Sequence, residues 1–378
     1  MDLVDRNLLI VTKRKFNGGV KVCTIHDLVR ELCLEKATKA NFCLKIHKPM
    51  SSYPVEVIMT HKQRHVFTYN DLNVMNLSNP PIPSIRSLLC FHTKTSMIFN
   101  SDEYIHPYML LMVLDLQKCG LNRKHFPDVI PLLVHLRYLA ICYPSRSFPS
   151  SICNLWSLQT LIVKTDFIPL VLPSTISNLV KLRHLWSDGD IYFPPIIKPM
   201  KLKTISNVKL GDGAKCWLKC FPGIKKLTCA LYTYDENDFK SLAYLESLKL
   251  IGSGSRKKSM ECRLPWSDIL IIQSLPNPEE LNLLDNAFEG PQWDTGEEQF
   301  PQLKFLKLQN LNIQQWHASN INFPHLKRLV LLKCNYLEEV PLEIGDISTL
   351  ELIETDDIIS IVESLDRIQE EREVRIIE

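Results

Sequence analysis

Long apolar runs are missing from this sequence. No stretch approaches the length of a membrane-spanning helix, and the first residues are acidic where a secretory signal would be apolar. An excess of one charge is missing too, because 44 Lys and Arg stand against 42 Asp and Glu. A nearly neutral chain has no field that would attract nucleic acid. We therefore predict a cytoplasmic protein without a transmembrane segment and without a nucleic-acid partner; peripheral membrane association is the alternative location.

The motifs of common catalytic sites are also missing. The chain has no G-x-x-x-x-G-K-[ST] phosphate loop and no G-x-S-x-G turn around a nucleophilic serine. His61 and His65 are four residues apart, but Lys62 stands where a zinc protease carries glutamate. Cys216 and Cys220 have no second ligand pair at the spacing of a metal site. We predict that the protein is not an enzyme and holds no metal.

Cysteine is not scarce in this sequence, which has 12 among 378 residues, but the distribution of the cysteines does not suggest a disulfide framework. The cysteines are spread along the chain, and several occupy apolar positions of a repeated motif. Disulfide frameworks are typical of short secreted chains, whereas scattered cysteines in a long chain favour buried thiols in a reducing compartment. We predict free thiols.

What the sequence does contain is one motif, L-x-x-L-x-L, repeated along most of its length. Ten steps lead from Leu114 to Ile353, 239 residues further on, which is about 24 residues per step. This is the period of leucine-rich repeats, in which each repeat contributes one short strand. Clear copies begin at Leu111, Leu136, Leu158, Leu182, Leu245, Leu303 and Leu326, and weaker copies contain Leu202, Ile224, Leu281 and Leu350.

Each repeat also carries the signature of a return path. The pattern Pro-x-x-Ile follows the strand at Pro127, Pro149, Pro173 and Pro341. Proline fixes φ and ends strand pairing, and the apolar residues after it can pack against the stack. Stacked repeats bury the strand leucines that one repeat alone leaves exposed. The predicted fold class is α/β, a leucine-rich-repeat solenoid with a curved parallel β-sheet on its concave side.

The beginning of the chain does not follow the repeat. Two β-prone runs, 8–12 and 20–23, flank an Asn-Gly-Gly turn at 17–19, which predicts a hairpin. Thr24 and Asp27 form a capping-box-like start for an amphipathic helix. The predicted domains are a hairpin-helix segment at 1–46, a connector at 47–63, the repeats at 64–356 with two degenerate opening copies, and a terminal capping helix at 357–378.

Three stretches carry a family resemblance. Residues 22–34, with Ile25, His26 and Asp27, are similar to the segment around a Met-His-Asp motif that ends a winged-helix domain. Residues 136–161 and 263–346 are similar to early and late repeats of the same family. The chain thus resembles the C-terminal part of plant intracellular coiled-coil, nucleotide-binding, leucine-rich-repeat disease-resistance proteins, and most closely the late-blight resistance protein homologues. It departs from the motif at Ile25, where the family carries methionine.

The resemblance implies that residues 1–46 are the C-terminal remnant of the winged-helix part of a nucleotide switch. Ile25, His26 and Asp27 would be its switch motif, in which the histidine contacts the phosphate of bound ADP. Asp27 would cap the following helix or orient the ring. Because the phosphate loop is missing, we expect ADP or ATP to bind only in a full-length receptor. We expect no cofactor in this chain. The resemblance implies that the chain is one part of a longer receptor.

The resemblance also implies a function in innate immunity, up to the hypersensitive response. The chain would be a recognition and autoinhibition module that binds proteins during defence against pathogens. Its expected partners are the nucleotide-binding and coiled-coil portion of a receptor, a pathogen effector, or a guarded host protein. Two alternatives stay open: a truncated decoy or non-functional relic, and a leucine-rich-repeat adaptor protein unrelated to immunity.

Outward positions of the repeat strands form the candidate recognition surface. Aromatic residues and arginine are the usual anchors of protein-binding sites, and lysine adds positive charge. Acidic residues also lie near these strands, namely Asp115, Asp188, Glu280, Glu354 and Asp356. The candidate recognition residues are Tyr138, His184, Trp186, Lys226, Lys249, Lys307 and Arg328.

Overall fold

The structure is a computed structural model of the chain. It describes residues 2–14, 19–46, 64–68, 84–91, 108–120, 126–210, 218–231, 239, 241–252, 264–297, 299–356, 358–371 and 374–377. The chain divides into two compact units, unit 1 with residues 1–15 and 19–201, and unit 2 with residues 202–378 together with 16–18. Each unit has its own core. The predicted connector at 47–63 lies outside the described residues.

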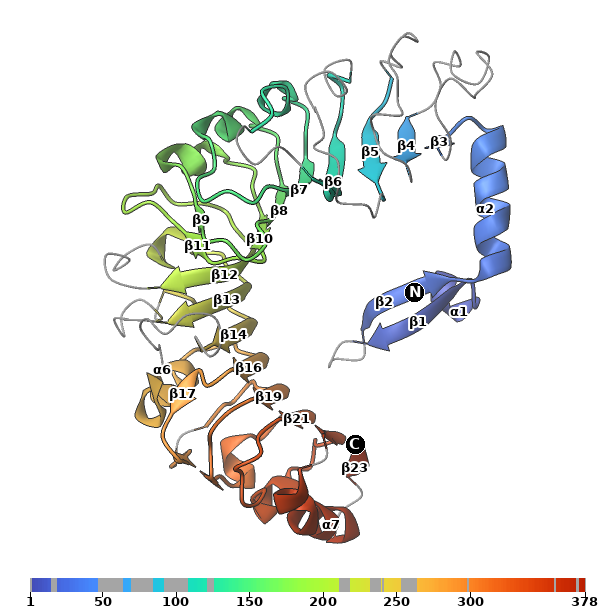
Figure 1. The fold of residues 1–378 in the computed structure, drawn as a ribbon. Helices are drawn as coiled ribbons and strands as arrows, with labels where there is room; N and C mark the ends of the chain where they lie inside the picture. Colours follow the sequence, from blue (N-terminus) through green and yellow to red (C-terminus); the bar gives the residue numbers. More distant parts are fainter. Residues whose placement is uncertain are drawn as a thin grey trace. The chain divides into compact units, whose positions relative to one another are not determined.

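Unit 1 begins with a small α/β segment (Figure 1). It contains helix α1 (Asp2–Asp5), the antiparallel strands β1 (Leu9–Arg14) and β2 (Val20–Ile25), and helix α2 (Asp27–Lys39). The predicted strand pair and helix are confirmed, although most of the turn between the strands lies outside the described residues. No residue of α2 is buried, so the expected packing of one helix face is not formed within this unit.

Parallel strands make up the rest of unit 1, one for each repeat. Each of these strands pairs with the one that follows it in the ladder. In ladder order the strands are β3 (Cys43–Ile46), β4 (His65–Thr68), β5 (Ser87–Cys90), β6 (Val113–Gly120), β7 (Tyr138–Cys142), β8 (Thr160–Lys164) and β10 (His184–Ser187). Strands β4 and β5 are the two degenerate opening repeats. The sheet starts at β3, earlier than the predicted boundary at 64, because a four-residue strand with few leucines gives little sequence signal.

Unit 2 continues the same plan with its own ladder of parallel strands. Each strand again pairs with the one that follows it. In ladder order they are β12 (Thr204–Leu210), β13 (Lys226–Leu231), β14 (Ser247–Ile251), β16 (Glu280–Leu284), β19 (Phe305–Gln309), β21 (Arg328–Leu332), β22 (Leu352–Thr355) and β23 (Arg375–Ile377). Strand β23 lies beyond the predicted end of the repeats at 356, after helix α7 (Val362–Glu371), which occupies the segment predicted as a terminal helix.

The return segments of the repeats are short 3-10 turns and two-to-three-residue strands. Pro149, Pro173 and Pro341 each precede such a turn, and the isoleucine three residues later is fully buried in each case. The turns are η3 (Ile130–Leu132), η4 (Ser150–Asn154), η5 (Ser174–Asn178), η6 (Leu218–Cys220), η7 (Trp266–Asp268), η8 (Asn320–Asn322), η9 (Leu342–Asp346) and η10 (Ile359–Ile361). The small strands β9 (Leu170–Val171) with β11 (Ile191–Tyr192), β15 (Leu264–Pro265) with β17 (Phe288–Glu289), and β18 (Gln292–Asp294) with β20 (Gln315–His317) form parallel pairs, and helix α6 (Ile269–Gln273) follows η7.

The core of each unit is a stack of equivalent leucines. Leu139, Leu161 and Leu185 are register partners on three adjacent strands, and each is at most 1% exposed. Alternate residues of the strands point the other way and are half-exposed, which is the period-two pattern of a strand with one buried face. In unit 2 the return side adds stacked indoles, with Trp293 4.8 Å from Trp266 and 5.3 Å from Trp316 between ring centres.

Left-handed backbone conformations end several strands of unit 2 at the same position. Asp285, Asn310 and Lys333 have φ of 53°, 53° and 55°, and each directly follows its strand. Asn and Asp tolerate this region better than other residues that carry a Cβ. The Asn310 side chain donates to the Asp285 carboxylate at 2.9 Å, so neighbouring turns are tied to each other.

The described cysteines are free. Cys229 and Cys334 are fully buried in the stack of unit 2, whereas Cys23 and Cys33 are exposed on the N-terminal segment of unit 1. Burial raises the pKa of the Cys334 thiol to about 11, so this thiol stays protonated and acts as a small apolar group. The prediction of free thiols is confirmed for the described cysteines; Cys216 and Cys262 lie outside the described residues.

We expect Leu161→Asp to unfold its region of unit 1, because the new carboxylate would be buried between two leucines without a partner. The free energy of unfolding should fall by more than about 3 kcal/mol. Urea titration followed by circular dichroism measures the change. Thr160→Asp is the matched control, because Thr160 is the outward-facing neighbour on the same strand. Equal stability of the two variants would contradict the assigned inward face.

Candidate functional site

Three of the predicted recognition residues lie close together on the sheet of unit 1. Tyr138 and His184 share one outward row, with Thr160 on the strand between them. Trp186 lies two residues further along β10, opposite Ile162. The side chains alternate between inside and outside along β10, so His184 and Trp186 project from the same face. The structure therefore places Tyr138, His184 and Trp186 on one face of the sheet, on the two strands β7 and β10 that flank β8.

The side chains of Tyr138 and His184 are uncharged near neutral pH. Burial, and then the nearby Asp115 carboxylate, raise the pKa of the Tyr138 phenol above its ordinary value. Burial, and then the positive charge of Arg183, lower the pKa of the His184 imidazole. Both groups thus favour their neutral forms, which can donate hydrogen bonds to a partner without bringing a charge into the contact.

The four basic candidates lie in unit 2 as two separate pairs. Lys226 and Lys249 occupy the adjacent strands β13 and β14. Lys307 and Arg328 occupy the adjacent strands β19 and β21. Strand β16 separates the pairs and presents Glu280 and Asn282, whose side chains are hydrogen-bonded to each other at 3.2 Å. The predicted basic surface is therefore interrupted by a polar strand.

Arg328 differs from Lys226 and Lys249 because its charge is already balanced by a described residue. Its guanidinium forms an ion pair with Glu354 on the next strand and lies 6.0 Å from the ring centre of Phe305. Lys226 and Lys249 make no ion pair with any described residue. Within unit 2, Lys226 and Lys249 are consequently better placed than Arg328 to contribute positive charge to a partner.

Two of the acidic residues noted near the strands stabilise turns. One carboxylate oxygen of Asp188 accepts the Thr165 backbone N–H at 2.6 Å and the Thr165 hydroxyl at 3.1 Å. Asp356 has a similar role in unit 2. Both of its carboxylate oxygens accept the Lys333 backbone N–H, at 2.8 and 3.0 Å. Each aspartate binds the turn amide of the preceding repeat. The sequence placed these two residues near the recognition strands without a role, and their hydrogen bonds show a structural one.

The segment that resembles a nucleotide switch has a different helix start from the predicted one. Thr24 is still paired with Ile10 in the hairpin, so it is unavailable as a cap. The N-cap is His26, whose ring Nδ1 accepts the Leu28 backbone N–H at 3.3 Å, and Asp27 is the first residue of the helix. The prediction of a cap by Thr24 or Asp27 is wrong. His26 is exposed, and its role in binding a phosphate stays a prediction.

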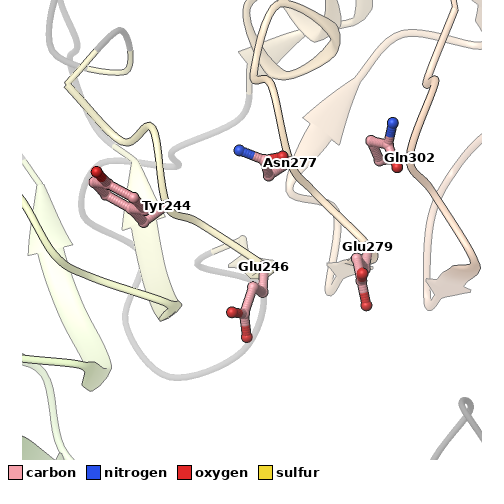
Figure 2. A pocket seen from close by; sticks show the side chains of 5 residues that line it. All are labelled: Tyr244, Glu246, Asn277, Glu279 and Gln302. Carbon is pink, nitrogen blue, oxygen red and sulfur yellow. The ribbon is translucent and has the colours of Figure 1, made fainter.

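A cavity of about 210 Å³ opens beside the strands of unit 2 (Figure 2). It is lined by Tyr244, Glu246, Asn277, Glu279 and Gln302. Both carboxylates are already engaged, Glu246 with Lys225 and Glu279 with Lys304, the latter at 2.7 Å. The lining residues come from the turns just before β14, β16 and β19. Paired carboxylates on a half-exposed turn are typical of a solvated edge of a repeat protein.

The described part of the chain has no helix that is both long and apolar enough to cross a membrane. Among the same described residues, no group of three or more His, Cys, Asp and Glu side chains is arranged to hold a metal ion.

Both the sequence and the fold match known proteins. The family model for a leucine-rich repeat region matches residues 84–276, which is half of the chain. The chain belongs to the leucine-rich-repeat family. A leucine-rich-repeat protein of Leptospira interrogans has the same fold, with a TM-score of 0.53 at 15% identity over 91% of this chain and 98% of its own. The predicted fold class is confirmed.

Plant relatives of this leucine-rich-repeat chain are much longer than the chain itself. Two late blight resistance protein homologs of Solanum demissum are each 31% identical over 98% of this chain, and the match spans 31% of their own length. A late blight resistance protein of the same species is 29% identical over 93% of this chain and 30% of its own. The resemblance noted in the sequence is confirmed, and this chain spans less than a third of the length of each of these three relatives.

Sequence reasoning missed one row of charged residues in this leucine-rich-repeat chain. It considered the residues inside the strands and not the position just before them, where Lys225, Glu246, Glu279 and Lys304 form two ion pairs. The signal was present, since each of these residues directly follows the first apolar position of its repeat, as Lys225 follows Ile224. Alignment of the repeats by that position would have revealed the row.

We expect Asp188→Ala to destabilise unit 1, because the Thr165 N–H would lose its acceptor, whereas the Thr165 hydroxyl keeps the Ile168 carbonyl at 2.6 Å. Thr165 is fully buried, so the loss should cost about 1–3 kcal/mol of unfolding free energy. Asp188→Asn keeps one acceptor oxygen and should cost less than Asp188→Ala. Chemical denaturation measures both variants. If Asp188→Ala is as stable as the unchanged protein, the turn does not depend on this carboxylate.

A second expectation concerns the pKa of His184. Burial and Arg183 lower it below the ordinary value of 6.5, so Arg183→Gln should raise it by removing the nearby positive charge. Titration of the His184 ring proton by nuclear magnetic resonance measures both values. Because burial is the larger cause, the Arg183→Gln value should still lie below 6.5. A pKa above 6.5 in the unchanged protein would contradict the described environment.

Proposed function

We propose that this chain is the recognition and autoinhibition module of a plant immune receptor that acts in the cytoplasm during the defence response. The observation that carries the proposal is its similarity, over 98% of its length, to late blight resistance protein homologs. A leucine-rich-repeat sheet with aromatic and basic side chains on its outward face is well suited to bind proteins. The proposal involves binding alone, and we assign no catalytic step to the chain.

Exposed apolar residues of the N-terminal segment support a role in holding another part of a receptor. Leu28 is 71% exposed, Leu32 is 54% exposed and Phe42 is 57% exposed. Ile10 and Val22 of the hairpin are also exposed. Neighbouring apolar residues that no other residue covers are typical of a surface that another chain or domain covers. We infer that the coiled-coil and nucleotide-binding portion of a related receptor covers them, and that this contact holds the resting state.

The outward face of the sheet would then recognise an activating partner, either a pathogen effector or a guarded host protein. Tyr138 and Trp186 supply large amphipathic surfaces, which often dominate binding energy. Lys226 and Lys249 supply positive charge that attracts an acidic partner and weakens with salt. Arg328 contributes less charge because Glu354 balances it.

We expect this chain to associate in trans with the coiled-coil and nucleotide-binding portion of a late blight resistance protein from Solanum demissum. Co-precipitation and gel filtration at low and at high salt measure the association. Leu28→Asp combined with Leu32→Asp should weaken it at least about tenfold, because charges would replace the apolar contact. Both residues are exposed, so the variant should still fold.

Ile321→Asp is the matched control, because Ile321 is 61% exposed in unit 2 and lies outside the proposed contact. It should leave the association unchanged. If two folded fragments fail to associate at either salt concentration, the autoinhibition proposal is wrong. The interpretation as a decoy or non-functional relic would then be favoured.

A further inference from the structure

A row of residues lies just before the parallel strands, and in unit 1 it is rich in arginine. Backbone hydrogen bonds link this row from repeat to repeat: the Arg86 N–H donates to the Arg64 carbonyl at 2.7 Å, and the Arg183 N–H donates to the Gln159 carbonyl at 2.8 Å. The members of the row are therefore neighbours in space. In order they are Arg64, Arg86, Met112, Arg137, Gln159 and Arg183.

In unit 2 six of the seven members of the same row neutralise one another in pairs, and Lys203 stands outside these pairs. The members of the row are linked by the same backbone hydrogen bonds, at 2.8 to 2.9 Å. Three ion pairs balance the charges along it, Lys225 with Glu246, Lys304 with Glu279, and Lys327 with Glu351. The complete row is Lys203, Lys225, Glu246, Glu279, Lys304, Lys327 and Glu351. Opposite charges on adjacent repeats thus stabilise this edge from within.

The four arginines of the row in unit 1 have no such counter-charges among the described residues. Arg64 and Arg137 are exposed and make no ion pair with any described residue. Arg86 donates to the Ser84 carbonyl at 3.4 Å, and Arg183 donates to two carbonyls of its own turn at 3.0 and 3.2 Å. These bonds use one nitrogen of each guanidinium, so most donors remain for another partner. The positive field also reaches His65, whose pKa is lowered by burial and then by Arg64.

Large apolar side chains accompany the arginines. Three residues before the row lie Met109, Trp156 and Val180, which are 38%, 61% and 63% exposed. Trp156 and Val180 occupy equivalent positions in the turns of two successive repeats, since each N–H donates to the carbonyl two residues earlier at 2.9 Å. Three residues before the row in unit 2 lie small residues or proline, namely Pro222, Ala243, Pro276, Pro301, Pro324 and Ser348, while Met200, three residues before Lys203, is buried. We name the surface made by the four arginines with Met109, Trp156 and Val180 the arginine edge.

We propose that the arginine edge docks an acidic, partly apolar polypeptide segment of another protein. Guanidinium groups bind carboxylates through paired hydrogen bonds, and Trp with Arg is the usual composition of a binding hot spot. Arg64 and Arg183 are five strand steps apart, which is about 24 Å at about 4.8 Å per step. An extended segment of about seven or eight residues spans that distance. The inference rests on the proposed function and names the chemistry of one partner.

A polypeptide fits the arginine edge better than a nucleic acid does. The formal net charge of the whole chain is only +2, whereas nucleic-acid binding favours a strongly basic domain. Of the exposed apolar members, Trp156 alone offers an aromatic face to a base, while Met109 and Val180 are aliphatic. Aliphatic surface beside arginine suits a polypeptide that presents both apolar and acidic side chains.

The test uses the full chain and a fluorescein-labelled synthetic peptide of alternating glutamate and leucine, followed by fluorescence anisotropy. Arg137→Gln combined with Arg183→Gln should raise the Kd at least about tenfold, and the Kd of the unchanged protein should rise with salt. The matched control combines Lys225→Gln, Lys304→Gln and Lys327→Gln at the same row of unit 2. It should change the Kd less than about twofold, because those charges are already paired. Circular dichroism checks that each variant is folded.

Three outcomes would overturn the inference. They are equal loss of binding in the arginine and lysine variants, no effect of the arginine substitutions, and tighter binding of single-stranded oligouridine than of the peptide. These outcomes are separable from failure of the proposed function. If the receptor fragment associates through Leu28 and Leu32 while the arginine substitutions leave the Kd of the peptide unchanged, the proposed function stands and the inference is wrong. If the peptide depends on the arginines while that fragment does not associate, the inference stands alone.

Discussion

The leucines of one strand cannot be buried by the repeat that carries them. Leu161 is fully buried because Leu139 and Leu185 lie on either side of it in adjacent strands. The hydrogen bonds of the parallel strands hold this spacing, so burial and backbone pairing are satisfied by the same neighbour. The register of the parallel strands in both units follows from the requirement that each repeat place its leucines level with those of the next.

A consequence of that requirement is that equivalent side chains of adjacent repeats are forced close together. A position that carries the same charge in every repeat would repel itself at about 4.8 Å, so the charges must alternate or be balanced from elsewhere. Backbone groups in the turns are also satisfied by the next repeat. Asp188 and Asp356 accept hydrogen bonds from backbone N–H groups that the preceding repeat leaves unpaired. Interactions between repeats thus complete the hydrogen bonds and charges that a single repeat leaves unsatisfied.

Sequence reasoning predicted the features that depend on period and phase. The strands, the Pro-x-x-Ile turns and the buried leucines follow from spacing alone, and the structure confirms them. Sequence reasoning misplaced the features that depend on a particular neighbour. Asp188 looked like a surface acid because its acceptor role involves Thr165, 23 residues earlier. His26 was not expected as a cap because Ser, Thr, Asp and Asn are the favoured residues there, and strand pairing had already engaged Thr24.

The candidate site was predictable in part for the same reason. Alternation along a strand identifies which residues face outward, so Tyr138, His184 and Trp186 could be grouped before their positions were known. Which of the basic candidates are balanced by an acidic residue could not be predicted. The Arg328–Glu354 pair connects residues on different strands and depends on side-chain geometry. Position within the repeat thus indicates where a residue lies, and only the structure shows what it contacts.

Unequal repeat lengths have a further consequence. Leu248 and Leu281 are 33 residues apart, yet β14 and β16 pair without a register shift over five residues. Leu306 and Leu329 are 23 residues apart, and β19 pairs with β21 in the same way. The strands therefore keep one spacing regardless of how much chain connects them, and added residues are accommodated in the connecting segment. Lengthening or shortening a return segment can change that side of a repeat while the outward face of the sheet keeps its pattern, so the two sides can be altered independently.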